Sequence, residues 1–185
     1  MALETRTDEE LIADLRTGNP DAFGELYRRY RSPLFAFCAR MVRDQNHAGD
    51  ILHDVFLTLY RSAATLREPG ALRIWLFRVA RNEVLMSARQ KREVASPDPD
   101  LVWDAETPET ILESAEQSEL LERGLRSLKT EYREVLLLRE EEGLSYAEIA
   151  IITGDSESSV KSRLFKARRA LATLLAPRLG ERSSR

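Results

Sequence analysis

Apolar residues recur at helical spacing in the N-terminal part of the chain, and the first such segment starts at a recognisable cap. Thr7 and Glu10 form a capping box, which predicts a helix that ends at Gly18. Asn19-Pro20 then breaks the chain, and a longer helix follows. Its apolar face consists of Phe23, Leu26, Tyr27, Tyr30, Leu34, Phe37 and Met41. Two further helices are predicted over residues 48–60 and 72–82, separated by a turn at residues 68–70.

The polar positions of these last two helices are as informative as the apolar ones. Residues 48–60 have a packing stripe of Ile51, Leu52, Val55, Phe56 and Leu59. Asp50, His53 and Asp54 then lie together on the opposite side, where a protein contact is the expected role. In residues 72–82, bulky apolar groups alternate with Arg73, Arg78 and Arg81. Such a helix either binds single-stranded DNA or has an ordinary solvated basic face. We expect Trp75 to lie in the core.

The C-terminal part has the pattern of two helices joined by a tight turn. Ser145 and Glu148 form a second capping box, Gly154 allows the turn, and Ser156 can cap the next helix. One apolar stripe of that second helix consists of Val160, Leu164, Ala167 and Leu171. The side chains that point elsewhere are Lys161, Ser162, Lys166 and Arg169. This helix-turn-helix signature predicts DNA binding, although basic helices are often only solvated surface.

Net charge divides the chain into three parts. Residues 1–92 contain 15 basic and 12 acidic residues, residues 93–122 contain 10 acidic residues and no basic one, and residues 123–185 contain 13 basic and 9 acidic residues. The net charge of −3 therefore describes neither end of the chain. Prolines at positions 97, 99 and 108 forbid a continuous helix between them. We expect a linker over residues 93–113, with helix resuming near residues 109–112, and Trp103 either docked on a domain or contacting a partner.

Composition excludes several classes of protein. The single cysteine, Cys38, lies in an apolar run, so no disulfide within the chain is possible and a buried thiol is expected. No apolar run approaches the ~20 residues that span a bilayer, so we expect a cytoplasmic protein without membrane insertion. His47 and His53 do not share a helical face, and no phosphate-cradling loop or nucleophile motif occurs. We therefore expect no enzyme, no metal site and no cofactor.

The order of these motifs resembles that of the extracytoplasmic-function (ECF) sigma factors, two-domain initiation factors of bacterial RNA polymerase. The segments that carry the resemblance are residues 21–30, 50–56, 75–82, 134–139, 143–150 and 160–169. The resemblance implies an all-α fold of two small helical domains joined by an acidic flexible linker. Region two would occupy residues 1–92, and the region four helix-turn-helix would occupy residues 114–185. The linker would thread through the polymerase, where its charge mimics nucleic acid.

The resemblance also implies partners and roles. Promoter DNA would be bound at its upstream element by Ser158, Lys161, Ser162, Arg163, Lys166, Arg168 and Arg169. Among these, Lys161, Ser162 and Lys166 are expected at the bases, and the arginines at phosphates or against the protein. The melted downstream element would be held by Arg73, Arg78, Arg81 and Asn82. The clamp helices of the polymerase beta-prime subunit would be bound by Asp50, His53, Asp54 and Phe56. An anti-sigma factor is a further implied partner.

This chain departs from the family pattern at several positions. His53 stands where glutamine is usual, and Leu66 and Leu72 stand in the loop of residues 65–72 where aromatic residues are common. Asp155 replaces an apolar residue, and we expect it either to cap the next helix rather than pack or to weaken the fold locally. Glu140 and Glu141 add negative charge next to a DNA-binding domain.

Two alternative functions remain at this point. A sigma-like decoy would occupy the polymerase or an anti-sigma factor without opening promoters. A helix-turn-helix repressor would not need the segments at residues 50–56 and 75–82. Such a repressor would also normally have a dimerisation or ligand-binding domain.

Overall fold

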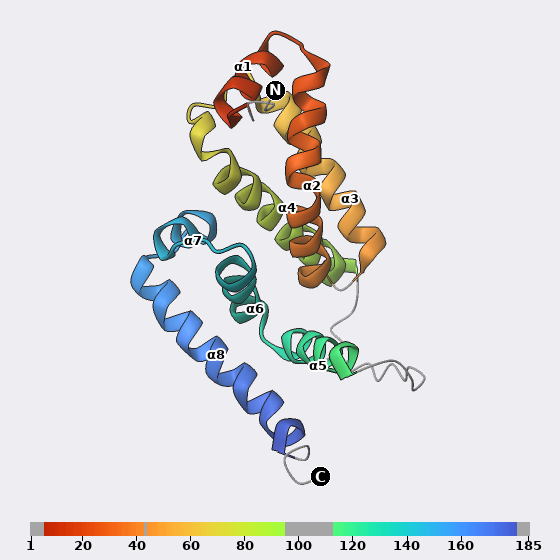
Figure 1. The fold of residues 1–185 in the computed structure, drawn as a ribbon, viewed down its shortest axis with the longest axis vertical. Helices are drawn as coiled ribbons and strands as arrows, with labels where there is room; N and C mark the ends of the chain where they lie inside the picture. Colours follow the sequence, from red (N-terminus) through yellow and green to blue (C-terminus); the bar gives the residue numbers. More distant parts are fainter. Residues whose placement is uncertain (1–5, 43, 95–112, 181–185) are drawn as a thin grey trace.

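A computed structural model describes residues 6–42, 44–94 and 113–180 of the chain, and these residues form helices and connecting turns without any β-strand (Figure 1). The predicted all-α fold is therefore confirmed for the described residues. The expected linker falls largely on residues 95–112, which lie outside them, together with Trp103 and the predicted helix start near residues 109–112. The helices on either side end at Val94 and resume at Glu113.

The N-terminal half is a bundle in which long helices pack along one another. Its helices are α1 (Asp8–Arg16), α2 (Pro20–Val42), α3 (Gln45–Ser62), a short 3-10 helix η1 (Pro69–Ala71) and α4 (Leu72–Val94). Helix α2 packs against α1, α3 and α4. Most of its predicted apolar face is buried, but Tyr27 is exposed and Phe23 is half-buried. Burial of such faces, rather than helix propensity, provides most of the stability of helices of this kind.

The C-terminal half contains the predicted helix-turn-helix. It consists of α5 (Glu113–Ser127), α6 (Thr130–Leu136), a π-helical turn η2 (Leu137–Glu141), α7 (Tyr146–Thr153) and α8 (Glu157–Gly180). Gly154 ends α7 in the left-handed conformation, with φ of 74°, which a glycine adopts without strain. Helix α8 then packs against α6 and α7 through Val160, Leu164 and Ala167.

The predicted helix starts are confirmed by their hydrogen bonds. The Thr7 hydroxyl accepts a bond from the Glu10 amide, and the Glu10 carboxylate accepts one from the Thr7 amide. Ser145 and Glu148 make the same reciprocal pair at the start of α7. Ser156 accepts a bond from the amide of Ser159 at the start of α8, at 3.2 Å. Local sequence therefore determines where these helices begin.

The two halves pack against each other and share a continuous buried core. Helix α7 lies against α4, and α6 lies against α2, as Figure 1 also shows. We call this relationship, in which α6, η2 and α7 pack on α2 and α4, the closed arrangement. Trp75 is half-buried against the core rather than inside it, so its predicted core position is only partly realised.

Candidate DNA and polymerase interfaces

The exposed face of α8 gathers most of the side chains expected at the upstream element. Because Val160, Leu164 and Ala167 are buried, the opposite face of the helix is turned to solvent. That exposed face carries Ser158, Lys161, Ser162, Lys166 and Arg169. It also carries Phe165, which is 67% exposed and which the sequence reasoning did not single out. The signal that would have identified Phe165 is an apolar residue placed outside the packing stripe of an amphipathic helix.

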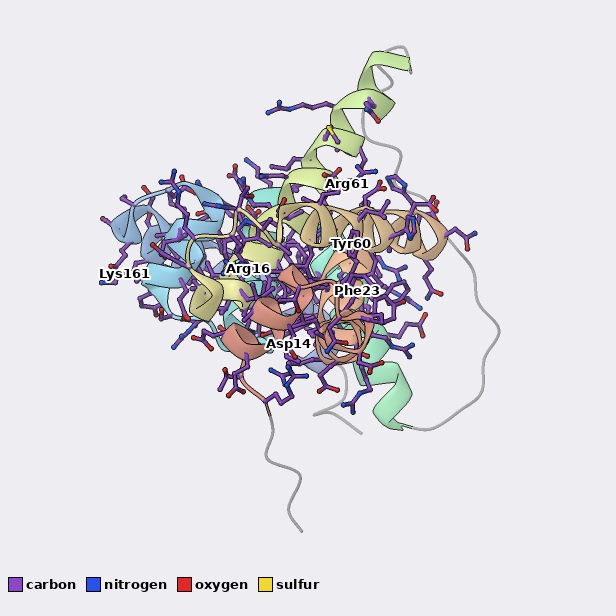
Figure 2. All side chains as sticks on the ribbon, turned by 90° about the horizontal axis from the view of Figure 1, so that it is seen from above. Asp14, Arg16, Phe23, Tyr60, Arg61 and Lys161 are labelled. Carbon is purple, nitrogen blue, oxygen red and sulfur yellow. The ribbon has the colours of Figure 1, made fainter. Side chains whose placement is uncertain are left out.

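Lys161 is tied to the first helix of the motif through an aromatic ring. Its Nζ lies 5.6 Å from the centroid of the Tyr146 ring, and the Arg139 guanidinium carbon lies 5.1 Å from the same ring. Arg139 also donates to the Leu144 carbonyl at 2.7 Å. The contact with the Tyr146 ring restricts Lys161 without neutralising its charge. The Lys161 side chain remains exposed at one edge of the molecule, where Figure 2 labels it.

Arg163 and Arg168 both pair with carboxylates of the C-terminal half. Arg163 makes a bidentate pair with Asp155, at 2.7 and 3.2 Å. Partial burial favours the neutral form of Asp155, but the bonds from Arg163 outweigh it and the pKa of this carboxyl is lowered. Asp155 therefore pairs with an arginine instead of capping α8, and Ser156 provides the cap. Arg168 pairs with Glu140 at 2.6 Å, but its side chain is 51% exposed, so only Arg163 fits the protein-facing alternative.

The π-helical turn directs three consecutive carboxylates to three different arginines. Glu140 pairs with Arg168 of α8, Glu141 with Arg40 of α2, and Glu142 with Arg73 of α4. The Glu142 amide donates to the Leu137 carbonyl, so the turn contains one more residue than an α-helical turn. The extra residue changes the direction of the side chains that follow. These carboxylates are therefore partnered. The repulsion of DNA expected for Glu140 and Glu141 is correspondingly reduced.

The four residues expected at the melted strand do not share one surface. Arg78 and Asn82 are exposed on α4, with Met86 one turn further along the same face. Arg73 and Arg81 are half-buried against the C-terminal half. Arg73 Nη2 donates to the Glu142 carbonyl at 2.6 Å and to its carboxylate at 2.9 Å. In the closed arrangement, α4 therefore presents only two of the four predicted residues to solvent.

Buried charges complete the junction between the halves. Glu134 of α6 is 3% exposed and pairs with Arg81. Burial raises the pKa of the Glu134 carboxyl, and the charge of Arg81 only partly opposes this rise. Arg133, also 3% exposed, donates to the main-chain carbonyls of Arg40 and Met41 at 3.0 and 3.3 Å. It thereby satisfies carbonyl groups at the end of α2 that the helix itself leaves unpaired.

The expected polymerase-contact residues of α3 separate into two groups. Asp50, His53 and Asp54 are exposed along one side of the helix. Phe56 is 3% exposed, so its expected surface role is wrong and it belongs to the core, where the Tyr27 ring lies 4.7 Å away. Its position in the predicted packing stripe had already indicated burial.

Another aromatic residue of α3 is exposed in place of Phe56. Tyr60 is 61% exposed, one turn further along the helix than Phe56. Its ring makes an edge contact with Phe23 at 5.9 Å, and Figure 2 shows the two together between α2 and α3.

The connection between α3 and α4 has its apolar residues turned inward. Leu66 is 8% exposed and Leu72 is fully buried, so neither forms a surface for a base. The exposed side chains of this connection are instead those of Ala64, Thr65, Arg67 and Glu68.

The described residues contain no group of three or more histidine, cysteine, aspartate or glutamate side chains that could hold a metal ion. Cys38 is fully buried, and burial raises the pKa of its thiol to about 12. Within the described part of the chain, no helix combines the length and apolar character needed to cross a bilayer.

Two family models match the chain. Sigma-70 region 2 matches residues 26–94, and Sigma-70, region 4 matches residues 118–171. The RNA polymerase sigma-H factor of Pseudomonas aeruginosa is 30% identical, covering 97% of this chain and 99% of that protein. The ECF RNA polymerase sigma-E factor of Escherichia coli K12 is also 30% identical, covering 94% of this chain and 97% of that protein.

Solved structures show the same similarity. CnrH, in complex with the cytosolic domain of CnrY, superposes with a TM-score of 0.71 at 25% identity, covering 93% of this chain and 99% of that chain. The sigma factor RpoE of Bartonella quintana, solved with the anti-sigma factor NepR, gives a TM-score of 0.65 at 23% identity, covering 83% of this chain and 96% of that chain. The motif order, the helix-turn-helix and the full-length relatives agree, and the chain belongs to the ECF subfamily of RNA polymerase sigma factors.

Proposed function

We propose that this sigma factor divides promoter recognition between α8, which reads the upstream element as duplex, and the exposed face of α4, which holds the melted downstream strand. The observation that carries the proposal is the exposed face of α8, where Ser158, Lys161, Ser162 and Phe165 lie opposite a fully buried stripe. A helix of this kind fits the major groove of duplex DNA.

On α8, the chemistry of each side chain suggests a different contact. Lys161, Ser162 and Lys166 can donate hydrogen bonds to base edges, and Phe165 fits against a thymine methyl group. Arg169 is placed to reach a phosphate. Arg163 keeps its partner Asp155 and so supports the helix from the protein side, whereas Arg168 pairs with Glu140 at the surface.

On α4, Arg78 and Asn82 are the residues that the closed arrangement leaves available for the extruded strand. Arg73 and Arg81 would join them only after releasing Glu142 and Glu134. We propose that the halves separate when the sigma factor binds the polymerase, so that strand phosphates replace these carboxylates. The acidic segment between the halves would then pass through the polymerase.

Asp50, His53 and Asp54 form the face that we propose for the clamp helices of the polymerase beta-prime subunit. Tyr60 extends this face with an exposed aromatic ring, a residue type that is enriched at protein interfaces. Phe56 supports the same helix from inside the core.

Regulation by a partner protein is supported by the similar structures. The Bartonella quintana sigma factor was solved with the anti-sigma factor NepR. We propose that an anti-sigma factor likewise binds this chain, and that the protein acts in the cytoplasm. A decoy function would keep binding to the polymerase but produce no transcripts, which makes it separable by experiment.

Footprinting of open complexes tests the division of labour: DNase I protection reports occupancy of the upstream duplex, and permanganate reactivity reports the unpaired thymines of the downstream strand. Holoenzymes containing Lys161→Ala, Asn82→Ala or wild-type sigma factor are compared on a duplex promoter and on the same promoter with a pre-melted downstream element. We expect Lys161→Ala to weaken occupancy of the upstream element on both templates. We expect Asn82→Ala to weaken binding of the downstream single strand on both templates, so pre-melting should restore neither variant. Equal upstream occupancy by Lys161→Ala and wild type would contradict the assignment of α8.

A further inference from the structure

Helix α1 lies outside the matched region 2 model, which begins at residue 26, yet it is firmly built into the bundle. Leu11 and Ile12 are fully buried, and Leu15 is 5% exposed. Asp8 accepts a bond from Arg29 Nη1 at 2.5 Å and another from the Tyr30 hydroxyl. These contacts attach α1 to α2 and so fix the position of the C-terminal end of α1.

That C-terminal end carries Arg16, whose guanidinium reaches the connection between α3 and α4. Nε donates to the Ala63 carbonyl at 2.9 Å, and Nη2 donates to the Leu66 carbonyl at 2.6 Å. Figure 2 shows Arg16 where α1 meets this connection. The planar guanidinium holds its donors in a rigid fork, so two bonds fix the relative positions of the two carbonyl groups.

The connection is held at further points. The amides of Thr65 and Leu66 both donate to the Ser62 carbonyl at 2.9 Å. Near its other end, a Cβ atom on Gly70 would lie 2.5 Å from Glu9 Oε1, so α1 also approaches the backbone there. Because Leu66 and Leu72 are buried, the connection has an ordered backbone with polar side chains outside.

We infer that Arg16 is a positioning residue for promoter opening. By fixing residues 63–68, it holds the exposed side chains of Thr65 and Arg67 in the connection that leads into α4, the helix on which we propose that Arg78 and Asn82 hold the extruded strand. The inference rests on the proposed function of α4. It adds to that function a second surface for the strand, formed by the exposed side chains of Thr65 and Arg67. Recognition by this surface uses a hydroxyl, a guanidinium and backbone groups, because Leu66 and Leu72 face the core.

The test measures three affinities of the full-length chain assembled with core polymerase. These are its affinity for the core enzyme, for an upstream-element duplex, and for a downstream-element single strand with a fluorescent base analogue. Arg16→Met removes both hydrogen bonds but keeps the aliphatic stem, and Arg16→Lys keeps one donor group. Arg28→Met is the matched control, because Arg28 is an exposed arginine of the same bundle that pairs only with Glu25 among the described contacts.

We expect Arg16→Met to weaken binding of the single strand roughly tenfold, the loss of about one base contact, and Arg16→Lys to give an intermediate loss. Core affinity and upstream-duplex affinity should stay at wild-type values, as should all three affinities of Arg28→Met. Arg67→Ala, which leaves the Arg16 bonds in place, should reproduce the strand-specific loss.

Two results would overturn the inference. If Arg16→Met binds the single strand as tightly as the wild type, the hydrogen bonds from Arg16 are not needed to position the connection. A parallel loss of all three affinities together with a lower melting temperature would show that Arg16 only stabilises the fold. A failure of the proposed function can be told apart from a failure of this inference. If α4 does not bind the strand, Asn82→Ala and Arg78→Ala will leave strand affinity unchanged, whatever the effect of Arg16→Met.

Discussion

Arg73 of α4 donates to Glu142 twice, to its main-chain carbonyl at 2.6 Å and to its carboxylate at 2.9 Å. This double contact joins a residue expected to bind DNA to a carboxylate of the other half of the molecule. A carboxylate that accepts from an arginine occupies the place that a phosphate oxygen would take. If Arg73 binds the melted strand as we propose, the closed arrangement competes with the strand for this arginine.

Releasing this contact should strengthen DNA binding by the isolated protein. Glu142→Gln removes the charge but keeps the side-chain shape. Arg73 is 42% exposed, so we expect only about 1 kcal/mol, or roughly fivefold tighter binding of a downstream single strand. Fluorescence anisotropy at low salt measures it.

Glu140→Gln is the control for this measurement. Glu140 lies two residues away but pairs with Arg168 within the C-terminal half, so its replacement should leave strand affinity unchanged. Equal effects of the two variants would mean that negative charge in general, and not the contact with Arg73, governs binding.

Phe165 should read a thymine methyl group in the upstream element. Replacing single thymines by uracil removes one methyl group at a time, and burying such a group contributes about 0.8 kcal/mol, or roughly fourfold in affinity. We expect one position at which uracil weakens binding of the wild-type protein but not of Phe165→Ala. A uracil scan that affects both proteins equally at every position would remove Phe165 from base recognition.

Lys161→Ala should weaken binding of the upstream element more than binding of random duplex. Lys161 is exposed and held near the Tyr146 ring, so its position on α8 is restricted. We expect a loss of about 1–3 kcal/mol on the cognate element. A gel-shift titration on both DNAs compares the losses, and equal values would indicate a phosphate contact instead.

Asp54→Arg should abolish binding to core polymerase. Asp54 is exposed on α3, and a reversed charge in an interface adds repulsion to the lost contact. Co-purification with core polymerase measures this effect, and retained binding of the upstream duplex shows that the C-terminal half is still folded. Undiminished co-purification would place the polymerase contact elsewhere.

Cys38 should make stability fall at alkaline pH. Burial raises the pKa of its thiol from 9.0 to about 12, so between these values the unfolded chain loses a proton that the folded chain keeps. The free energy of unfolding should therefore decrease by about 1.4 kcal/mol per pH unit in this range, with no effect below pH 9. Urea unfolding of wild type and Cys38→Ala isolates the contribution, and identical pH slopes would contradict it.

The sequence predicts the local features of this fold and misses those that depend on distant parts of the chain. The capping boxes at Thr7 and Ser145 and the buried stripe of α8 follow from spacing alone. The positions of Arg73 and Arg81 do not, because a single helix pattern cannot show which of its arginines will meet a carboxylate from the other half. Phe56 differs from these residues, because the family resemblance assigns it to the polymerase contact whereas its position in the packing stripe of α3 predicts the burial that the structure shows.

The π-helical turn is the clearest case of an unpredictable element. The apolar pattern of residues 137–141 does not distinguish an α-helix from a π-helical turn, and the extra residue is visible only in the hydrogen bond from the Glu142 amide to the Leu137 carbonyl. Arg16 was also missed, since its partners Ala63 and Leu66 contribute main-chain carbonyls, which carry no sequence signal.

Run-off transcription tests the central claim most directly. Core bacterial RNA polymerase is mixed with this protein and a library of upstream regions from its host, and transcript starts are sequenced. The account predicts specific transcripts whose promoters share two spaced motifs, with Asn82→Ala suppressing transcripts from all of them. Demonstrable binding to core polymerase without any specific transcript would contradict it and establish a decoy.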